Sequence, residues 1–261
     1  MIKSESLLPR EMQQHTYSIM YEVEETHWWF VGRRRIIESF VREICRGINK
    51  NGIDESRPRI LDVGCGTGAN LELLARFGDA EGVDVSTDAL AFCHERGLSN
   101  VQQSTAEKLP YGEASFDLVT ALDVIEHLDD DVAGLREIRR VIAPGGHVLL
   151  FVPAFMFLWG VQDDVSNHRR RYTLPQLKRV VREAGFEIER ATYANITFFA
   201  PTLLGRAVMR ATGLRPESES KINVAALNGV LGRVLGAESF LLRHLNFPFG
   251  VSALCVARRI E

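Results

Sequence analysis

Three alternating glycines after an apolar run form the part of this sequence most clearly suited to chemistry. Gly64, Gly66 and Gly68 follow a strand-like stretch at 59–63, and a helical pattern begins directly after them. Such a turn lets a ligand lie against bare backbone at the carboxyl edge of a parallel sheet. Asp84 ends the next apolar run, 20 residues after Gly64, where a carboxylate can accept hydrogen bonds from both ribose hydroxyls. The spacing predicts a site for an adenosine-containing cofactor.

Two classes of cofactor use this geometry. The glycines also fit a Gly-x-Gly-x-x-Ala pattern ending at Ala69, which a nicotinamide dinucleotide site accepts. Asp62, just before the glycines, favours the other class, because a carboxylate there would repel a pyrophosphate but suits a cofactor with an ammonium group. An NAD-binding oxidoreductase therefore stays as an alternative.

Four further segments follow the glycine turn in order. They are Ala-Glu-Lys-Leu-Pro-Tyr at 106–111, Ser-Phe-Asp-Leu-Val at 115–119, Asp-Val-Ile-Glu-His-Leu at 123–128 and Ile-Ala-Pro-Gly-Gly at 142–146. With the glycine turn, residues 58–192 resemble the class I S-adenosylmethionine-dependent methyltransferases, in the branch of small-molecule and quinone methyltransferases. The resemblance implies S-adenosyl-L-methionine as the cofactor and an enzyme that transfers its methyl group. It also implies a Rossmann-like α/β fold, with a doubly wound, mostly parallel, seven-stranded sheet.

The resemblance and the chemistry of the side chains agree on the cofactor contacts. Asp62 would orient the amino end of the cofactor, directly or through water, and Asp84 would hold its ribose. Arg33 or Arg34 would neutralise the methionine carboxylate if the amino-terminal segment folds over the cofactor. Thr105 stands where the family often has an aspartate that accepts from the adenine amino group, and it carries no charge. The predicted cofactor-binding residues are Arg33, Asp62, Gly64, Cys65, Gly66, Asp84, Val85, Thr105, Ala106, Glu107, Leu122 and Asp123.

Methyl transfer to a hydroxyl needs alignment and a base. His127 is the leading candidate, because it follows the fourth predicted strand on the cofactor side of the sheet. The alternative is that His127 only packs against the following helix. His168 and Tyr172 belong to a segment that resembles a His-x-Arg-x-Tyr/Phe-Thr stretch of related methyltransferases. They are predicted either to face the acceptor or to brace the loop against the sheet.

We predict no metal site, although one arrangement resembles one. Asp123, Glu126 and His127 are similar to the Glu-x-x-Glu-His arrangement that holds a divalent ion in some quinone-precursor O-methyltransferases. Asp123 is shorter than the glutamate of that pattern, so the sequence leaves the need for a metal open.

Apolar runs predict alternating strands and helices around this site. Strands are expected near 59–63, 80–84, 100–103, 116–122, 146–152, 186–192 and 251–257. Helices are expected near 69–77, 87–96, 130–142 and 174–184. This alternation implies a parallel sheet covered on both faces, and the last strand resembles the closing antiparallel member of the methyltransferase sheet.

The same patterns suggest three parts. Residues 1–57 are predicted to form an amino-terminal helical lid, and residues 58–194 with 250–261 the methyltransferase core. Residues 195–249 are predicted to form an inserted helical cap, because a loop this long inside a domain usually has structure of its own. The lid carries His-Trp-Trp-Phe-x-Gly-Arg-Arg at 27–34, which resembles a bacterial methyltransferase subgroup linked to polysaccharide and natural-product pathways.

The acceptor is less defined than the cofactor. We expect a hydroxyl, or less readily an amine, of a small organic molecule beneath the lid. A second hypothesis has the amphipathic helices of 195–249 resting on a membrane and receiving a lipid-linked substrate. A third has the aromatic amino-terminal segment and 195–249 packing on each other or forming a dimer interface, so that the protein is a monomer or a homodimer. A cofactor-binding subunit without catalysis is a further alternative.

Composition narrows the partners and the compartment. A formal net charge of −3 argues against nucleic acid as the main partner. The 4 cysteines form no Cys-x-x-Cys pair, which suits reduced thiols in a cytosolic protein. The first ten residues lack a long apolar run, so no signal peptide is expected. We predict a cytoplasmic protein, with 195–249 as the segment for any peripheral membrane contact.

Overall fold

The computed structural model describes residues 14–51, 57–213 and 225–261. The first 13 residues of the predicted lid and residues 214–224 of the predicted cap lie outside this range. So does part of the connector before the first strand.

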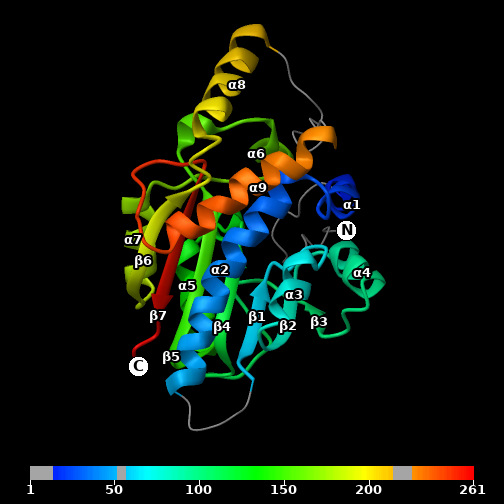
Figure 1. Ribbon diagram of the computed structural model, residues 1–261. Helices are drawn as coiled ribbons and strands as arrows, with labels where there is room; N and C mark the ends of the chain where they lie inside the picture. Colours follow the sequence, from blue (N-terminus) through cyan, green and yellow to red (C-terminus); the bar gives the residue numbers. More distant parts are fainter. Residues whose placement is uncertain (1–13, 52–56, 214–224) are drawn as a thin grey trace, which may run out of the picture.

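A seven-stranded sheet forms the centre of the protein, in the order β3-β2-β1-β4-β5-β7-β6 (Figure 1). The strands are β1 Arg59–Val63, β2 Asp79–Asp84, β3 Val101–Gln103, β4 Phe116–Leu122, β5 Ile142–Pro153, β6 Glu187–Ala194 and β7 Ser252–Arg258. The pairs from β3 to β5 are parallel, whereas β7 runs antiparallel to both β5 and β6. The doubly wound, mostly parallel sheet expected from the sequence is therefore confirmed. Its parallel strands bring their carboxyl ends to one edge.

Helices cover both faces of this sheet (Figure 1). The described helices are α1 Gln14–Val23, α2 Trp28–Asn51, α3 Ala69–Leu74, α4 Thr87–Glu95, α5 Asp131–Val141, α6 Val161–Val165, α7 Leu174–Glu183, α8 Phe199–Thr212 and α9 Ala225–Leu242, with the 3₁₀ turns η1 Ile125–His127 and η2 Met156–Leu158. Residues of β4 alternate between the two layers. Leu118 and Leu122 pack with side chains of α2 and α9, whereas Val119 and Ala121 pack with side chains of α5 and α7. This period of two is what a strand buried on both faces requires.

The helices begin where local side chains satisfy their first backbone donors. Ser86 caps α4 by accepting from the backbone N–H of Ala89, and Asp130 caps α5 by accepting from that of Ala133. Thr173 caps α7 and forms a capping box with Gln176. Because such caps are short sequence patterns, the positions where these helices begin can be predicted from the sequence.

α2 and α9 pack along each other although the chain separates them widely. A Cβ atom built on Gly32 of α2 would lie 2.6 Å from the Cβ of Leu235 on α9, so the two backbones approach closely because Gly32 has no side chain. Leu235 is buried in the same cluster as Ile36 and Phe40 of α2 and Phe151 of β5. α2, from the predicted lid, and α9, from the predicted cap, thus form a layer that packs directly on the sheet.

Two features differ from the sequence-based expectations. β5 begins at Ile142, before the Pro-Gly-Gly turn expected to precede it, because the β4–β5 register shifts between Phe116 and Leu118 and absorbs the extra residues as a bulge. The loop after β5 contains η2 and α6. No helix was expected there, because the residues show no helical periodicity of apolar side chains. In the described part of the chain, none of the helices combines the length and apolar character needed to cross a bilayer.

Candidate functional site

A cavity of about 590 Å³ runs along the carboxyl edge of the sheet. Its walls come from the glycine turn, the ends of β2, β4 and β5, the inner sides of α1 and α8, and the start of α2. Of the predicted site residues, the cavity is lined by Arg33, Gly64, Cys65, Gly66, Asp84, Val85, Ala106, Glu107, Leu122, Asp123, His127 and His168. Asp62, Thr105 and Tyr172 do not line it.

The glycine turn and Asp84 are joined by backbone hydrogen bonds. The Gly66 N–H donates to Asp84 Oδ2 and the Ser86 N–H to Asp84 Oδ1, each at 2.9 Å. Gly66 has a φ of 54°, and a Cβ built on it would meet no atom within 4 Å, so its backbone is open to a ligand. At Gly64, a Cβ would lie 2.6 Å from Val124 Cγ2. The turn thus needs glycine for close packing at one position and for left-handed backbone at both.

Asp62 lies beneath this turn and is not exposed to the cavity. Its carboxyl is buried, and Asp62 Oδ1 accepts a hydrogen bond of 2.6 Å from Thr120 Oγ1. Burial raises the pKa of Asp62 to about 7, against the lowering effects of the Thr120 hydrogen bond and of Arg33. Asp62 does not line the cavity, so any effect on the cofactor passes through neighbouring groups or water. Its role in orienting the amino end of the cofactor stays a prediction. Asp62 lies in the strand β1, whose side chains at this level point into the protein interior.

The raised pKa of Asp62 predicts how stability depends on pH. Because the folded pKa exceeds the unfolded value near 3.9, the stability that Asp62 contributes is fully present below about pH 4 and is lost as the pH rises to about 7. In Asp62→Asn, this part of the decline in the free energy of unfolding should disappear. Urea denaturation of the ligand-free protein at pH 5 and pH 8 measures it, with Asp79→Asn at the exposed start of β2 as control. An equal decline in both variants would contradict the assignment.

Thr105 and Tyr172 also lie outside the cavity lining. Thr105 forms an isolated antiparallel bridge with Lys108, and its neighbours Ser104 and Ala106 line the cavity instead. Tyr172 is buried, and its hydroxyl lies 2.8 Å from Asp131 Oδ2. Burial, followed by this hydrogen bond, raises the pKa of Tyr172. Tyr172 thus fastens the loop after β5 to α5. Its backbone N–H also donates to the Pro153 carbonyl of β5, which agrees with the alternative that this residue braces the loop against the sheet.

Arg33 reaches the cavity from α2. Its side chain is buried, with Nη2 2.7 Å from Asp123 Oδ2 and the guanidinium over the rings of Trp29 and Phe151. The Nε atom of Arg33 has no hydrogen-bond partner among the described residues. Asp123, at the end of β4, has a φ of 60°, a conformation that non-glycine residues adopt at a cost and mostly at functional sites. A cation and a carboxylate therefore face the cavity as a pair.

The amino-terminal segment is fastened over the glycine turn by contacts that sequence reasoning missed. Glu24, next to α1, is buried. Its Oε1 accepts a hydrogen bond of 2.5 Å from Thr67 Oγ1 and one of 2.6 Å from Arg96 Nη2. The ring of Tyr21 stacks on Phe92 of α4. α1 therefore forms part of the cavity wall by contacts with the turn and with the end of α4.

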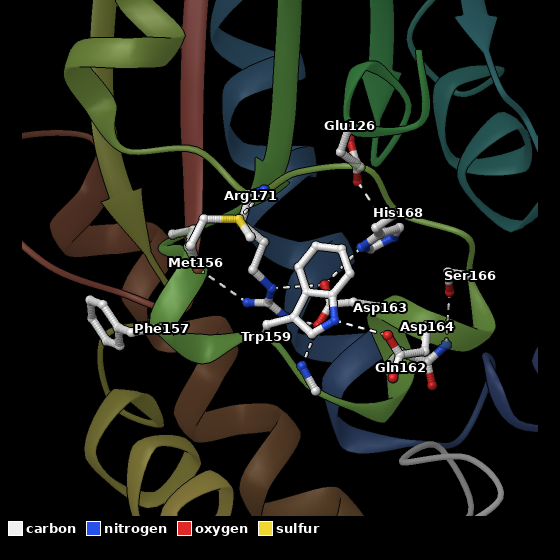
Figure 2. A network of polar contacts seen from close by, with 12 residues as sticks. Glu126, Met156, Phe157, Trp159, Gln162, Asp163, Asp164, Ser166, His168 and Arg171 are labelled. Atoms are coloured by element: carbon white, nitrogen blue, oxygen red, sulfur yellow. Dashed lines mark hydrogen bonds and ion pairs between the residues drawn. The ribbon is translucent and has the colours of Figure 1, made fainter. Parts of the chain in front are cut away.

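Asp163, His168 and Arg171, which line the cavity, form a polar network (Figure 2). His168 Nδ1 lies 2.8 Å from Asp163 Oδ1, and Arg171 donates to both oxygens of Asp163 at 2.7 and 2.9 Å. Burial alone would raise the pKa of Asp163, but the hydrogen bonds from His168 and Arg171 outweigh it and lower the pKa to about 2. Asp163 is therefore ionised. Since His168 Nδ1–H donates to it, Nε2 of the neutral imidazole is the proton acceptor.

His127 differs from His168 in its surroundings, although their rings meet edge to face at 4.7 Å between centroids. Burial, then the nearby His168 and Arg169, lower the pKa of His127 to about 3. His127 is therefore neutral at physiological pH and a weak base. The leading candidate from the sequence is thus in the cavity wall but is less suited to accept a proton than its neighbour.

Glu126 lies beside both histidines and is fully buried. Neither carboxyl oxygen has a hydrogen-bond partner among the described residues, and His168 Nε2 lies 3.9 Å from Glu126 Oε1. Burial and the charge of Asp123 raise the pKa of Glu126 well above its ordinary value. Ligand atoms of Glu126, His127 and His168 lie within 4.8 Å of one another. This set differs from the one that the sequence suggested, because Asp123 is paired with Arg33.

Comparison with known proteins adds to this geometry. A family model described as a methyltransferase domain matches residues 61–150. The 27-O-demethylrifamycin SV methyltransferase of Amycolatopsis mediterranei is 28% identical over 195 residues, which are 67% of this chain and 70% of that protein. The ubiquinone biosynthesis O-methyltransferase of Alkalilimnicola ehrlichii is 39% identical over 98 residues, 35% of this chain and 40% of that protein. The second match thus covers less than two thirds of the relative.

Solved structures show the same fold. A SAM-dependent methyltransferase of Thermotoga maritima, described as a possible histamine N-methyltransferase, has a TM-score of 0.54 at 18% identity, over 93% of this chain and 99% of that one. Identity this low supports similarity of the fold alone. The relatives named here are methyltransferases, so the NAD-binding oxidoreductase that the glycine pattern left open receives no support from them.

Proposed function

The chain belongs to the class I S-adenosylmethionine-dependent methyltransferases, and on this premise we propose that it methylates a hydroxyl oxygen of a small organic acceptor. S-adenosyl-L-methionine supplies a methyl group on positively charged sulfur, which is already a good leaving group. The protein therefore has to align the acceptor and remove its proton. The two O-methyltransferase-like relatives support a hydroxyl over an amine. The first of them supports a natural-product pathway.

The observation that carries this proposal is the 2.8 Å hydrogen bond between His168 and the ionised Asp163 at the cavity wall. Asp163 fixes the tautomer of His168 and stabilises the imidazolium that forms when Nε2 takes the hydroxyl proton. A carboxylate behind an imidazole has this effect wherever a histidine acts as a base. Amine methylation needs no such base if the amine is already neutral, so the pair favours a hydroxyl.

The cofactor would be held at the other half of the cavity. Asp84 would bind the ribose hydroxyls, and the open backbone at Gly66 would let the ligand approach the turn. The Arg33–Asp123 pair offers a cation for a carboxylate and a carboxylate for an ammonium group, which are the two charges of the methionine end. Ala106 and Glu107 also line the cavity and would contact the adenine.

The direct test is methyl transfer from S-adenosyl-L-methionine with a tritiated methyl group to a panel of phenols, sugars, aliphatic alcohols and amines. We expect labelled ethers from hydroxyl acceptors. Labelled amines alone would show that the acceptor is an amine. Tight binding of the cofactor with no turnover on any panel member would favour the non-catalytic cofactor-binding subunit.

Removal of metal ions should leave the activity unchanged within about twofold. Burial and the charge of Asp123 raise the pKa of Glu126, so a divalent ion would have to displace the proton of this carboxyl before binding to it. Protein dialysed against EDTA is assayed with and without added Mg²⁺, and cofactor binding is measured as a control for intact folding. Loss of activity that Mg²⁺ restores would show that Glu126, His127 and His168 bind a metal in place of the proposed base.

A second candidate acceptor is a lipid-linked molecule delivered at a membrane surface. Large apolar side chains are exposed on α8 and α9, among them Leu204, Val230 and Phe240. A homodimer interface would explain the same exposure. Flotation with lipid vesicles, compared with the mass in solution by light scattering, separates the membrane contact from the dimer and from a monomer.

A further inference from the structure

Asn195 is the residue directly after β6, and it combines an unusual backbone with a buried side chain. Its φ is 57°, in the left-handed region, and only 3% of its surface is exposed. It lines the cavity. Its carbonyl accepts from the Val251 N–H, and a Cβ on Gly250 would lie 2.2 Å from the carbonyl oxygen of Ala194. Tight packing against the segment 250–251 therefore fixes the backbone at Asn195.

The side chain of Asn195 is not explained by this packing. Its Oδ1 is buried without a hydrogen-bond partner among the residues that the structure describes. A buried amide oxygen without a hydrogen-bond partner is costly and rare in folded proteins. The left-handed backbone alone would be served better by glycine, which adopts it without strain and has no amide to bury. The two costs meet in one residue at the cavity wall, which is typical of binding sites.

Asn195 lies at the end of the cavity opposite to Asp84. The strands β1, β4, β5 and β7 separate β2, which carries Asp84, from β6. Near the β6 end, the cavity is lined by Phe198 and by Trp28, whose rings are 4.3 Å apart between centroids, and by Met209 of α8. This half therefore offers apolar and aromatic surface for a ring, with the amide as a polar group beside it.

We infer that Asn195 determines acceptor specificity by hydrogen bonding to a second oxygen of the acceptor. The inference rests on the proposed function, and it narrows the substrate class. The acceptor has an apolar or aromatic ring that carries the hydroxyl to be methylated and a further hydroxyl or carbonyl. An amide both donates and accepts, so either oxygen type pairs with it. A site built for such a group rejects analogues without it, because its own buried amide then stays unpaired.

The test uses binding, so that it does not depend on turnover. Wild-type protein and Asn195→Gly are saturated with S-adenosylhomocysteine and titrated with phenol, resorcinol and 3-hydroxybenzaldehyde. Glycine keeps the left-handed backbone and removes the amide. Wild type should bind at least one of the two-oxygen probes about tenfold more tightly than phenol, and Asn195→Gly should lose this preference with its cofactor affinity and melting temperature maintained. Asn100→Gly, an exposed position before β3, is the matched control.

The outcomes separate the two claims. A preference for two-oxygen probes that persists in Asn195→Gly, or that is absent from the wild type, would overturn the role of Asn195. Wild-type protein that shows the preference but methylates none of the hydroxyl panel would leave the binding role in place and refute O-methylation. A lower melting temperature in Asn195→Gly would show that the amide supports the fold, and the inference would then be wrong.

Discussion

Replacing His168 with alanine should lower kcat for a hydroxyl acceptor by about 10²- to 10⁴-fold, with little change in cofactor affinity. The loss follows from removing an imidazole that lies in the cavity wall and is backed by an ionised carboxylate. A single-turnover assay with labelled S-adenosyl-L-methionine measures the chemical step directly. His94→Ala, on the exposed side of α4, is the matched control and should keep full activity.

Asp163→Asn tests whether the carboxylate acts through His168. The amide keeps the size of the side chain but removes the charge that stabilises the imidazolium. The kcat should fall less than in His168→Ala, and Asp163→Asn should lower kcat little further in a protein that already carries His168→Ala, because the carboxylate acts through the imidazole. A purely structural role would lower kcat to the same extent with and without His168.

His127→Ala serves as the internal comparison. With a pKa near 3, His127 is a poor proton acceptor, so its removal should reduce kcat much less than the removal of His168. If the order of the two effects is reversed, His127 is the base that the sequence first suggested. If His168→Ala stays within about threefold of wild type, the acceptor ionises without help from this side chain.

The cofactor half of the site could be predicted from the sequence because its determinants are local. Gly64, Gly66 and Asp84 belong to two neighbouring strands and to the turns that follow them, and parallel β1 and β2 bring those ends together. The spacing of glycines and an acidic residue therefore carries the geometry. Thr105 does not line the cavity, because a single antiparallel bridge to Lys108 decides which of its neighbours face the cavity. No periodicity in the sequence indicates such a bridge.

The acceptor half could not be predicted to the same extent, since it depends on distant contacts. The ion pair of Arg171 with Asp163 comes from a loop without periodic signal. Glu24 accepts a hydrogen bond from Thr67, which lies 43 positions further along the chain. Asn195 carries no motif at all, and only its buried amide in the folded chain identifies it. Tyr172 was predicted by resemblance, but a hydroxyl in that segment can reach either the cavity or α5, and packing selects α5.

Removal of the Asp84 side chain should have the largest effect on cofactor binding. In Asp84→Ala, we expect the dissociation constant for S-adenosyl-L-methionine to rise by about 100-fold or more. Hydrogen bonds to a charged group contribute roughly 1.5–3 kcal/mol each, and a ribose offers two hydroxyls. Titration calorimetry measures the change, and Asp79→Ala at the exposed start of the same strand is the control.

Asp84 also holds the turn, so the two effects have to be separated. Its oxygens accept from Gly66 N–H and Ser86 N–H, and a carboxylate oxygen can accept more than one hydrogen bond. The ligand-free melting temperature of Asp84→Ala reports the loss of the backbone contacts. The further rise on adding saturating S-adenosylhomocysteine reports ligand binding by mass action. If the ligand-free protein melts lower but the rise equals that of wild type, Asp84 only shapes the turn. We expect the rise itself to disappear, because backbone N–H groups orient this carboxylate at the cavity wall before any ligand binds, and a preorganised charge loses little entropy when it binds a hydroxyl.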